Sequence, residues 1–204
     1  MPPRSDATAP TAATILGATR ACLLAEGYAG LSTRKVAGEA GVPLSQVHYH
    51  FGSKRGLVLA LLESENQRRL ARQTAMYGED VPLWRRYEQA CDFLEDDLES
   101  GYVRVLQEMI AAGWSSPELA DEVRGLLRGW YELLTGVARE AAERLGGLGP
   151  FTPDEAATLV GNLFIGSEAL LLLGFDRHEL PIRQSLRRVG TVLREAEDRA
   201  GEDG

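Results

Sequence analysis

The feature that most constrains this chain is the spacing of its apolar residues, which recur every three or four positions from end to end. No segment keeps the strict apolar–polar alternation of a half-buried strand. A period near 3.6 places apolar side chains on one face of an α-helix, whereas a strand needs a period of two. The sequence therefore predicts an all-α protein of about nine helices without a sheet.

Glycine and proline residues divide this pattern into segments. Gly27 is expected to end the first helix in the left-handed conformation. Ser116-Pro117 opens a long helix, with serine as the cap and proline in the first turn. Thr152-Pro153-Asp154-Glu155 forms a capping box for a nearly all-apolar helix. The expected helices span about residues 14–26, 33–40, 44–49, 54–77, 83–98, 102–112, 117–145 and 153–173, with a last one after Pro181.

Charge is distributed unevenly along the chain, which carries a net charge of −8. Residues 1–60 hold six basic and three acidic side chains, whereas the remaining 144 residues hold sixteen basic and twenty-seven acidic ones. This asymmetry is expected if only the first segment meets a polyanion. We predict a DNA-binding domain over residues 13–60 and a helical ligand-binding and dimerisation domain over residues 61–199. Residues 1–12 and 200–204 are expected to be disordered.

Residues 31–51, LSTRKVAGEAGVPLSQVHYHF, have the pattern of a helix-turn-helix. Two short helices flank a tight turn that contains Gly41, and small apolar residues such as Val36 and Val47 hold the helices at a fixed angle. The second helix of such a unit lies in the major groove of DNA. The continuation into Gly-Ser-Lys and a long amphipathic helix makes the pattern more specific.

With this continuation the sequence resembles the tetracycline-repressor (TetR) family of bacterial regulators. The resemblance covers about residues 14–62 and rests on Ile15-Leu16, Gly27-Tyr28, Arg34, Val36-Ala37, Ala40-Gly41-Val42, Tyr49-His50-Phe51, Ser53-Lys54 and Leu57. Beyond residue 62 only the number and lengths of the helices match. Four positions depart from the family pattern and bear on the DNA sequence recognised: Pro43, Ser45, His48 and Arg55.

The residues expected to bind DNA lie on the two helices of the motif and at the start of the next one. They are Thr33, Arg34, Lys35, Ser45, Gln46, His48, Tyr49, His50, Lys54 and Arg55. Gln46 is the first candidate for reading a base edge, because its amide can pair with adenine through two hydrogen bonds. Lys54 is expected to bind a phosphate. Arg55 stands where the helix dipole disfavours a cation, and a DNA phosphate would reverse that effect.

The last two helices predict a partner subunit. The final helix has apolar residues at steps of four, three, four and three, a narrow seam suited to another helix. The helix before it is apolar nearly all round and must be buried on every side. The family resemblance likewise implies a homodimer through a four-helix bundle. The residues expected at its interface are Leu163, Leu170, Ile182, Leu186, Val189 and Leu193.

Aromatic side chains and a methionine on several helices of the second domain suggest a pocket for a small-molecule effector. Each of these residues can equally be an ordinary part of the hydrophobic core. The candidates are Trp84, Tyr87, Met109, Trp114, Trp130, Tyr131, Phe164 and Glu168. Glu168 and Asn162 are polar residues in the most apolar helix, where burial without partners is expensive. They can serve either the pocket or the dimer interface.

Other classes of protein find little support. No stretch approaches eighteen consecutive apolar residues, so no transmembrane helix is expected. Cys22 and Cys91 lack metal-like spacing and are expected to be buried thiols in a reducing cytoplasm. Two histidines, His48 and His50, point to different faces of a helix and make a poor metal pair. Phosphate loops and nucleophile elbows are absent. We expect a cytoplasmic protein that is not an enzyme and uses no cofactor or metal.

Three hypotheses follow. The favoured one is a repressor released from a palindromic operator, on double-stranded DNA, by a small apolar or aromatic ligand. The alternative is an effector-independent DNA-binding protein, controlled by a partner protein or organising chromosomal DNA. An all-helical enzyme is disfavoured because no catalytic constellation is present. An enclosed apolar cavity in the second domain would favour the first hypothesis over the second.

Overall fold

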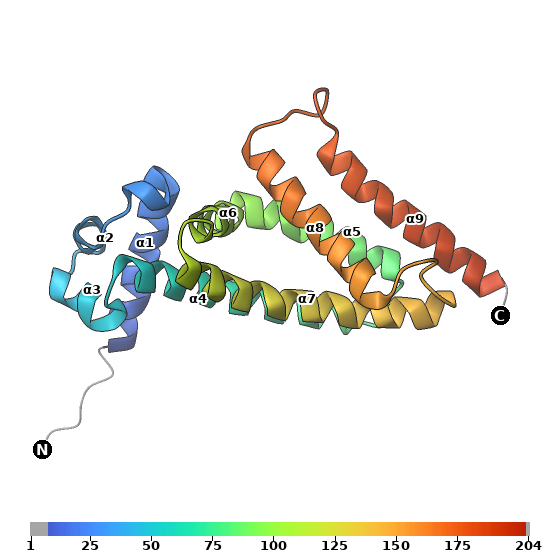
Figure 1. The fold of residues 1–204 in the computed structure, drawn as a ribbon, viewed down its shortest axis with the longest axis horizontal. Coiled ribbons are helices and arrows are strands. Elements are labelled where there is room, and N and C mark those ends of the chain that lie inside the picture. Colours follow the sequence, from blue (N-terminus) through green and yellow to red (C-terminus); the bar gives the residue numbers. More distant parts are fainter. Residues whose placement is uncertain (1–7, 203–204) are drawn as a thin grey trace, which may run out of the picture. The chain divides into compact units, whose positions relative to one another are not determined.

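The computed structural model describes the backbone of residues 8–202 and the side chains of residues 11–202. Within this part every regular element is a helix, which confirms the all-α prediction (Figure 1). The helices are α1 (Thr8–Gly30), α2 (Thr33–Ala40), α3 (Leu44–Phe51), α4 (Lys54–Tyr77), α5 (Leu83–Glu99), α6 (Tyr102–Gly113), α7 (Pro117–Leu145), α8 (Pro153–Leu172) and α9 (Ile182–Glu202).

The chain ends differ from the expectation of disorder. Helix α1 begins at Thr8, so residues 8–12 are helical. A proline at position 10 is compatible with this start, because the first turn of a helix needs no backbone N–H at that point. At the other end α9 continues to Glu202. Residues 1–7 and 203–204, the rest of the two predicted disordered segments, lie outside the described residues.

The described chain divides into two compact units. One contains the chain up to Gln67 together with Arg104–Arg124, and the other contains Arg68–Val103 and the residues from Gly125 onward. Most of α6 and the first turns of α7 therefore group with the helix-turn-helix, although the sequence placed them in a second domain that began at residue 61. Helical periodicity identifies a helix and its buried face, but it does not say which neighbour covers that face.

In the first unit, Gly27 breaks α1 with a positive φ of 69°, and one more turn follows before the chain leaves the helix at Gly30. The carboxylate of Glu108, on α6, accepts a hydrogen bond from the backbone N–H of Tyr28 (3.1 Å). A Cβ at position 27 would lie 2.9 Å from the Glu108 carboxylate. The positive φ is what requires glycine at this break, because other residues rarely adopt that backbone conformation.

In the second unit, α5 and α9 run antiparallel and are joined by three ion pairs. Arg183, Arg187 and Arg194 contact Glu95, Asp92 and Glu88 at 2.8, 2.7 and 3.4 Å. The carboxylate of Glu197 accepts hydrogen bonds from the backbone N–H groups of Leu83 and Trp84 and so caps α5 from another helix. The pairing fixes which face of α9 meets α5.

That face of α9 is the narrow apolar seam that the sequence placed at a dimer interface. Ile182 is buried and Leu186 is only 2% exposed within the single chain, while Val189 and Leu193 are half-buried on the same side. Ile182 and Leu186 therefore pack within the chain, and their assignment to a subunit interface stays a prediction. A seam at steps of four and three predicts helix packing, but the partner helix can belong to the same chain.

Helix α8 begins with the predicted capping box: Thr152 accepts from the N–H of Glu155, whose carboxylate accepts from the N–H of Thr152. Its inner face is buried, whereas Leu163 and Leu173 on the opposite side are exposed. The helix is thus covered on one side only. Among the described helices it alone has the length and hydropathy of a membrane span. Core helices of soluble proteins share these properties, and the sequence predicted no span.

Candidate nucleic-acid interface and core cavity

Helix α3 has one buried face and one open face. Val47 is fully buried, and α3 contacts α2, whose buried residues are Val36 and Ala37. The open face carries the other candidate residues of this helix that are exposed: Ser45, Gln46, His48 and Tyr49. An exposed fraction of 75% for Tyr49 is high for an aromatic side chain. This helix therefore presents hydrogen-bonding groups outward from a fixed support, as a reader of DNA requires.

The remaining candidates of the motif lie beside this face. Arg34 and Lys35 are exposed, and Thr33 is half-buried in the first turn of α2. His50 is half-buried, with its ring centroid 5.8 Å from that of Phe51. Its Nε2 atom is buried and has no hydrogen-bond partner among the described residues. Nδ1 of His48 lies 2.9 Å from the carbonyl oxygen of Gly52 and can cap the end of α3.

The two helices begin differently. The Ser32 side chain caps α2 by accepting a hydrogen bond from the N–H of Lys35 (3.3 Å). The N-cap of α3 is Pro43, which provides no side-chain hydrogen bond. The first backbone N–H groups of a helix have no partner within it and attract anions. At the start of α3 the backbone N–H of Gln46 instead donates to the carbonyl of Pro43 (2.9 Å).

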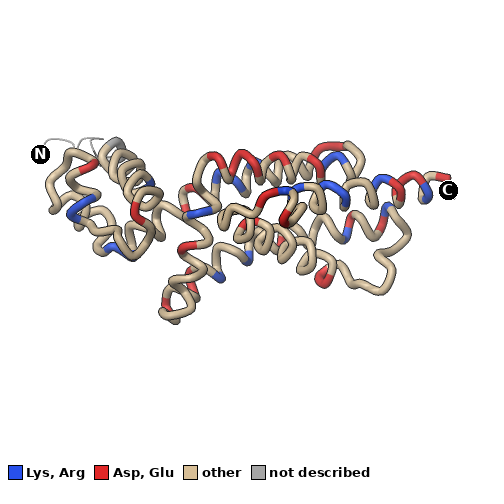
Figure 2. The backbone as a smooth tube through the Cα atoms, turned by 90° about the horizontal axis from the view of Figure 1, so that it is seen from above, with Lys and Arg blue, Asp and Glu red and all other residues tan. Residues whose placement is uncertain are grey.

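Three of the cations expected to bind DNA have partners within the first unit. Lys35 pairs with Glu26, and Arg55 pairs with Glu118 in the first turn of α7. Lys54 lies 4.4 Å from the ring centroid of Tyr28 and donates to the carbonyl of Ala29 (3.4 Å). The charge of Arg55, which the sequence placed against an unfavourable dipole, is therefore balanced by a carboxylate. Beyond residue 60, acidic side chains are abundant along the helices (Figure 2).

A cavity of about 140 Å³ lies in the second unit, among side chains of α4, α5, α7, α8 and α9 and of Leu148. Most of its wall is aliphatic. It is lined by Tyr77, Leu83, Arg86, Tyr87, Leu134, Val137, Ala138, Ala141, Leu148, Ala156, Ala157, Val160 and Leu193. The small alanine side chains leave the space open, because they do not reach across it. Burial raises the pKa of Tyr77 to about 12 and also raises the pKa of Tyr87, so both phenols remain protonated.

Arg86 is the charged residue of this wall and is only 2% exposed. Its Nη1 donates to Glu140 (2.8 Å), and Nη2 donates to the backbone carbonyl of Glu79. Glu140 also pairs with Arg144 (2.7 Å). The sequence analysis missed Arg86, although a signal was present: an arginine stands beside Tyr87 on the apolar stripe that begins at Leu83. A charge on a buried face needs a partner and often marks a function.

Of the eight residues expected to line a ligand pocket, Tyr87 alone lines this cavity. Phe164 and Trp130 pack beside it: the Phe164 ring is 5.8 Å from that of Tyr87, and Trp130 contacts the cluster around Leu134. Met109 and Trp114 belong to the first unit, where Met109 is fully buried and Trp114 is 83% exposed. Aromatic content therefore did not identify the cavity, whose wall is built from alanine and aliphatic residues.

The remaining candidates lie elsewhere in the second unit. Trp84 stacks against Arg194, whose guanidinium carbon is 3.8 Å from the ring centroid. Tyr131 donates to Asn162 (2.9 Å), so both are satisfied by each other. A Cβ at Gly161 would lie 2.3 Å from the Tyr131 ring, which explains glycine at that position. Glu168 is half-buried, and together with desolvation it raises the pKa of Tyr131.

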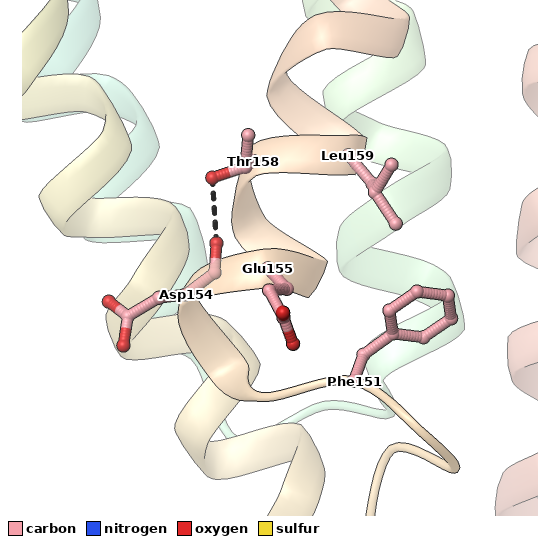
Figure 3. Close-up of a pocket in the computed structure, with 5 residues that line it drawn as sticks. All are labelled: Phe151, Asp154, Glu155, Thr158 and Leu159. Carbon is pink, nitrogen blue, oxygen red and sulfur yellow. Dashed lines mark hydrogen bonds between the residues drawn. The ribbon is translucent and has the colours of Figure 1, made fainter.

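A shallow hollow of about 360 Å³ lies at the start of α8 (Figure 3). Asp154, Glu155 and Thr158 line it together with Phe151 and Leu159, and Thr158 donates to the Asp154 carbonyl (2.8 Å). Phe151 and Leu159 are both about half exposed, at 47% and 52%. The hollow is open surface, and its two apolar side chains continue the exposed face of α8.

Comparison with known proteins agrees with these observations. Residues 15–61 match the sequence profile of the bacterial regulatory proteins of the tetR family. This segment contains α2, α3 and the open face described above. No curated protein sequence matches the chain significantly.

Solved structures of regulators share the fold over nearly the whole chain. The transcriptional regulator FadR from Bacillus subtilis, in complex with stearoyl-CoA, has a TM-score of 0.73 at 15% identity, covering 89% of this chain and 96% of its own. A TetR-family regulator from Rhodococcus sp. has a TM-score of 0.73 at 21% identity, covering 91% and 98%. A regulator from Saccharomonospora viridis, in complex with choline, has a TM-score of 0.73 at 21% identity, covering 88% and 95%.

Proposed function

We propose that the chain is a TetR-family transcriptional regulator, a repressor that leaves a palindromic operator when a small apolar molecule binds its core cavity; its helix-turn-helix segment and its fold support this. The observation that carries this proposal is the open face of α3. Ser45, Gln46 and Tyr49 are exposed there, while Val47 anchors the same helix in the core. A recognition helix needs both properties at once.

We propose that Gln46 reads a base edge and that Arg34 and Lys54 bind phosphates. The amide of Gln46 and the guanidinium of Arg34 are both exposed, on α3 and at the start of α2. Lys54 and Arg55 would exchange their present partners for phosphate oxygens. For Arg55 the exchange costs little, because exposed ion pairs contribute little stability. The net positive charge of residues 1–60 and the acidic remainder orient the approach to DNA.

We propose that two copies dimerise through the exposed apolar face of α8. Leu159, Leu163 and Leu173 lie on this face, and Val192 adds an exposed apolar side chain on α9. Large apolar patches are rare on monomers and mark interaction sites, and several exposed apolar side chains on one helix suggest such a patch. Leu163 and Leu170 keep the role expected from the sequence, whereas the seam of α9 is used within the chain. A two-fold dimer would place two α3 helices on successive half-sites.

Helix α7 supplies a route from the cavity to the DNA-binding residues. Its first turn carries Glu118, the partner of Arg55. The same helix continues to Leu134, Ala138 and Ala141 in the cavity wall. We propose that a ligand acts on DNA binding through α7, whose residues belong to both units. An apolar cavity in the second unit supports the ligand-responsive hypothesis over that of an effector-independent DNA-binding protein. We propose that the protein acts in the cytoplasm.

Selection from a pool of random duplexes tests the proposal. The purified protein is expected to recover a palindrome whose half-sites are centred about 34–36 Å apart, one helical turn of DNA. Gln46→Ala should recover a motif that has lost its preference at one base pair of each half-site. Fragments without a repeated half-site, or an unchanged motif for Gln46→Ala, would contradict the assigned roles.

A further inference from the structure

Two residues of the cavity wall each carry a polar atom that nothing in the described chain satisfies. The hydroxyl of Tyr87 and the Nε atom of Arg86 are buried and have no hydrogen-bond partner. Both residues line the cavity, and they are 7% and 2% exposed. A buried hydroxyl without a partner loses its hydration without compensation, so an unpaired group in a native core calls for an explanation.

Resting on the proposed function, we propose that this cavity takes an uncharged molecule about the size of one aromatic ring that carries one hydrogen-bond acceptor, and that the hydroxyl of Tyr87 donates to this acceptor. An aryl ketone, ester or aldehyde has this chemistry. The inference goes beyond the general expectation of an apolar effector, because it names the polar group and the residue that recognises it.

The direction of the hydrogen bond follows from the two unpaired groups. Arg Nε carries a hydrogen and can only donate. Burial raises the pKa of Tyr87, so its phenol keeps a proton to donate. A ligand that brings only donors would leave Nε unsatisfied. A carbonyl oxygen accepts without donating and has two lone pairs, which suits this wall.

The charge of the ligand follows from the pairing of Arg86. Its positive charge is already balanced by Glu140, which also pairs with Arg144. Outside this network the wall consists of two tyrosines and aliphatic side chains. An anion would find no unbalanced cation, and a cation would find no unbalanced carboxylate. Either would lose its hydration without compensation, which strongly disfavours binding.

The size follows from the volume. A space of about 140 Å³ resembles the 150 Å³ apolar cavity that binds benzene. Long acyl chains exceed it. Ala138 and Ala157 set this volume, because their side chains end at the wall. A larger residue at either position would fill the space.

Four probes of equal ring size test the proposal with the full-length protein: acetophenone, ethylbenzene, benzoate and benzylammonium. Binding is measured by calorimetry and by protein-detected NMR, without DNA. Acetophenone is expected to bind roughly fivefold more tightly than ethylbenzene, the factor that one net hydrogen bond of about 1 kcal/mol supplies. Benzoate and benzylammonium are expected not to bind.

Three variants assign the effect to the residue. Tyr87→Phe should raise the unfolding midpoint, bind ethylbenzene as before and lose the preference for acetophenone. Tyr77→Phe, a change at the other tyrosine of the wall, should keep the preference. Ala138→Leu should abolish binding of both neutral probes. Loss of preference in Tyr77→Phe instead of Tyr87→Phe, tighter binding of a charged probe, or failure of both neutral probes to bind would overturn the proposal.

The result is separable from the proposed function. If acetophenone binds with the expected preference but leaves operator affinity unchanged at fixed salt, the ligand chemistry stands and the proposed release mechanism fails for this molecule. If a ligand releases the operator but binds Tyr87→Phe as tightly as the unmodified protein, the release mechanism stands and the assigned ligand chemistry fails.

Discussion

Helices α3 and α8 both have one buried face and one open face, but the open faces differ in chemistry. On α3 the inner side holds Val47, and the outer side holds polar side chains such as Gln46. On α8 the inner side holds Phe164, and the outer side holds leucines such as Leu163. Polar groups on a fixed support suit a hydrated polyanion, whereas exposed leucines suit a second apolar surface. The composition of an unburied face thus indicates what kind of partner covers it.

The largest expected effect tests the apolar face of α8. Leu163→Glu combined with Leu173→Glu would bury uncompensated charges in the proposed subunit interface. At about 3–5 kcal/mol for each such charge, the dimer should weaken by at least about 10³-fold. Light scattering should then report a folded monomer at concentrations where the unmodified protein is dimeric.

Leu186→Glu is the matched control on α9. This residue is 2% exposed within the chain, so the same change should unfold the second unit rather than separate two folded subunits. Circular dichroism distinguishes the outcomes. A folded monomer from Leu186→Glu would restore the α9 seam as the subunit interface, and a dimer that persists in the α8 double variant would remove α8 from it.

The next effect tests the polar face of α3. Gln46→Ala should cost about 1–3 kcal/mol on the preferred operator and little on duplexes altered at the base pair that Gln46 reads. Lys54→Ala should instead weaken binding to all duplexes alike and reduce the salt dependence by about one counterion. Fluorescence anisotropy across salt concentrations measures both. Uniform loss for Gln46→Ala would make that residue a backbone contact.

The comparison of α3 with the second unit also explains which features could be predicted from the sequence. Residues 31–51 could be assigned from sequence because a helix-turn-helix depends on local signals, a capping serine and a glycine with φ of 65° at Gly41. The cavity could not be assigned from sequence, because it depends on which helices pack together. Its alanines, such as Ala138, are ordinary helix formers in sequence and become a wall only through packing. Trp114 shows the converse, since a large aromatic residue expected in a pocket is exposed.

A smaller effect concerns the cation beside α3. Glu118→Gln would release Arg55 from its carboxylate without removing volume. DNA binding should tighten a few-fold on all sequences, with a salt dependence steeper by about one counterion as Arg55 gains a phosphate. Glu122→Gln, four residues along α7, is the control and should change affinity less, because Arg55 bonds to Glu118. Unchanged affinity and salt slope in Glu118→Gln would leave Arg55 outside the DNA contacts.

The smallest expected effect concerns the N-terminal caps of α8 and α3. Thr152→Ala removes the side-chain cap of α8 and should cost about 1 kcal/mol of unfolding free energy. Thr152→Ser keeps the cap and should be nearly neutral. In α3 the N-cap Pro43 makes no such hydrogen bond. Pro43→Ala should therefore lower the free energy of unfolding by roughly 0.4–1 kcal/mol, mainly because the unfolded chain gains conformational freedom. Urea denaturation measures all three.

The capping box also predicts a pH dependence. Hydrogen bonds from the backbone N–H and the hydroxyl of Thr152 hold the pKa of Glu155 below its usual value. Because the folded state binds the proton less readily than the unfolded state, this contribution is present above the unfolded pKa of about 4.3. It is lost as pH falls through the lower folded pKa. The difference in unfolding free energy between the unmodified protein and Glu155→Gln should therefore shrink in that acidic window, and a difference that grows there would show that the Glu155 carboxylate does not stabilise the start of α8.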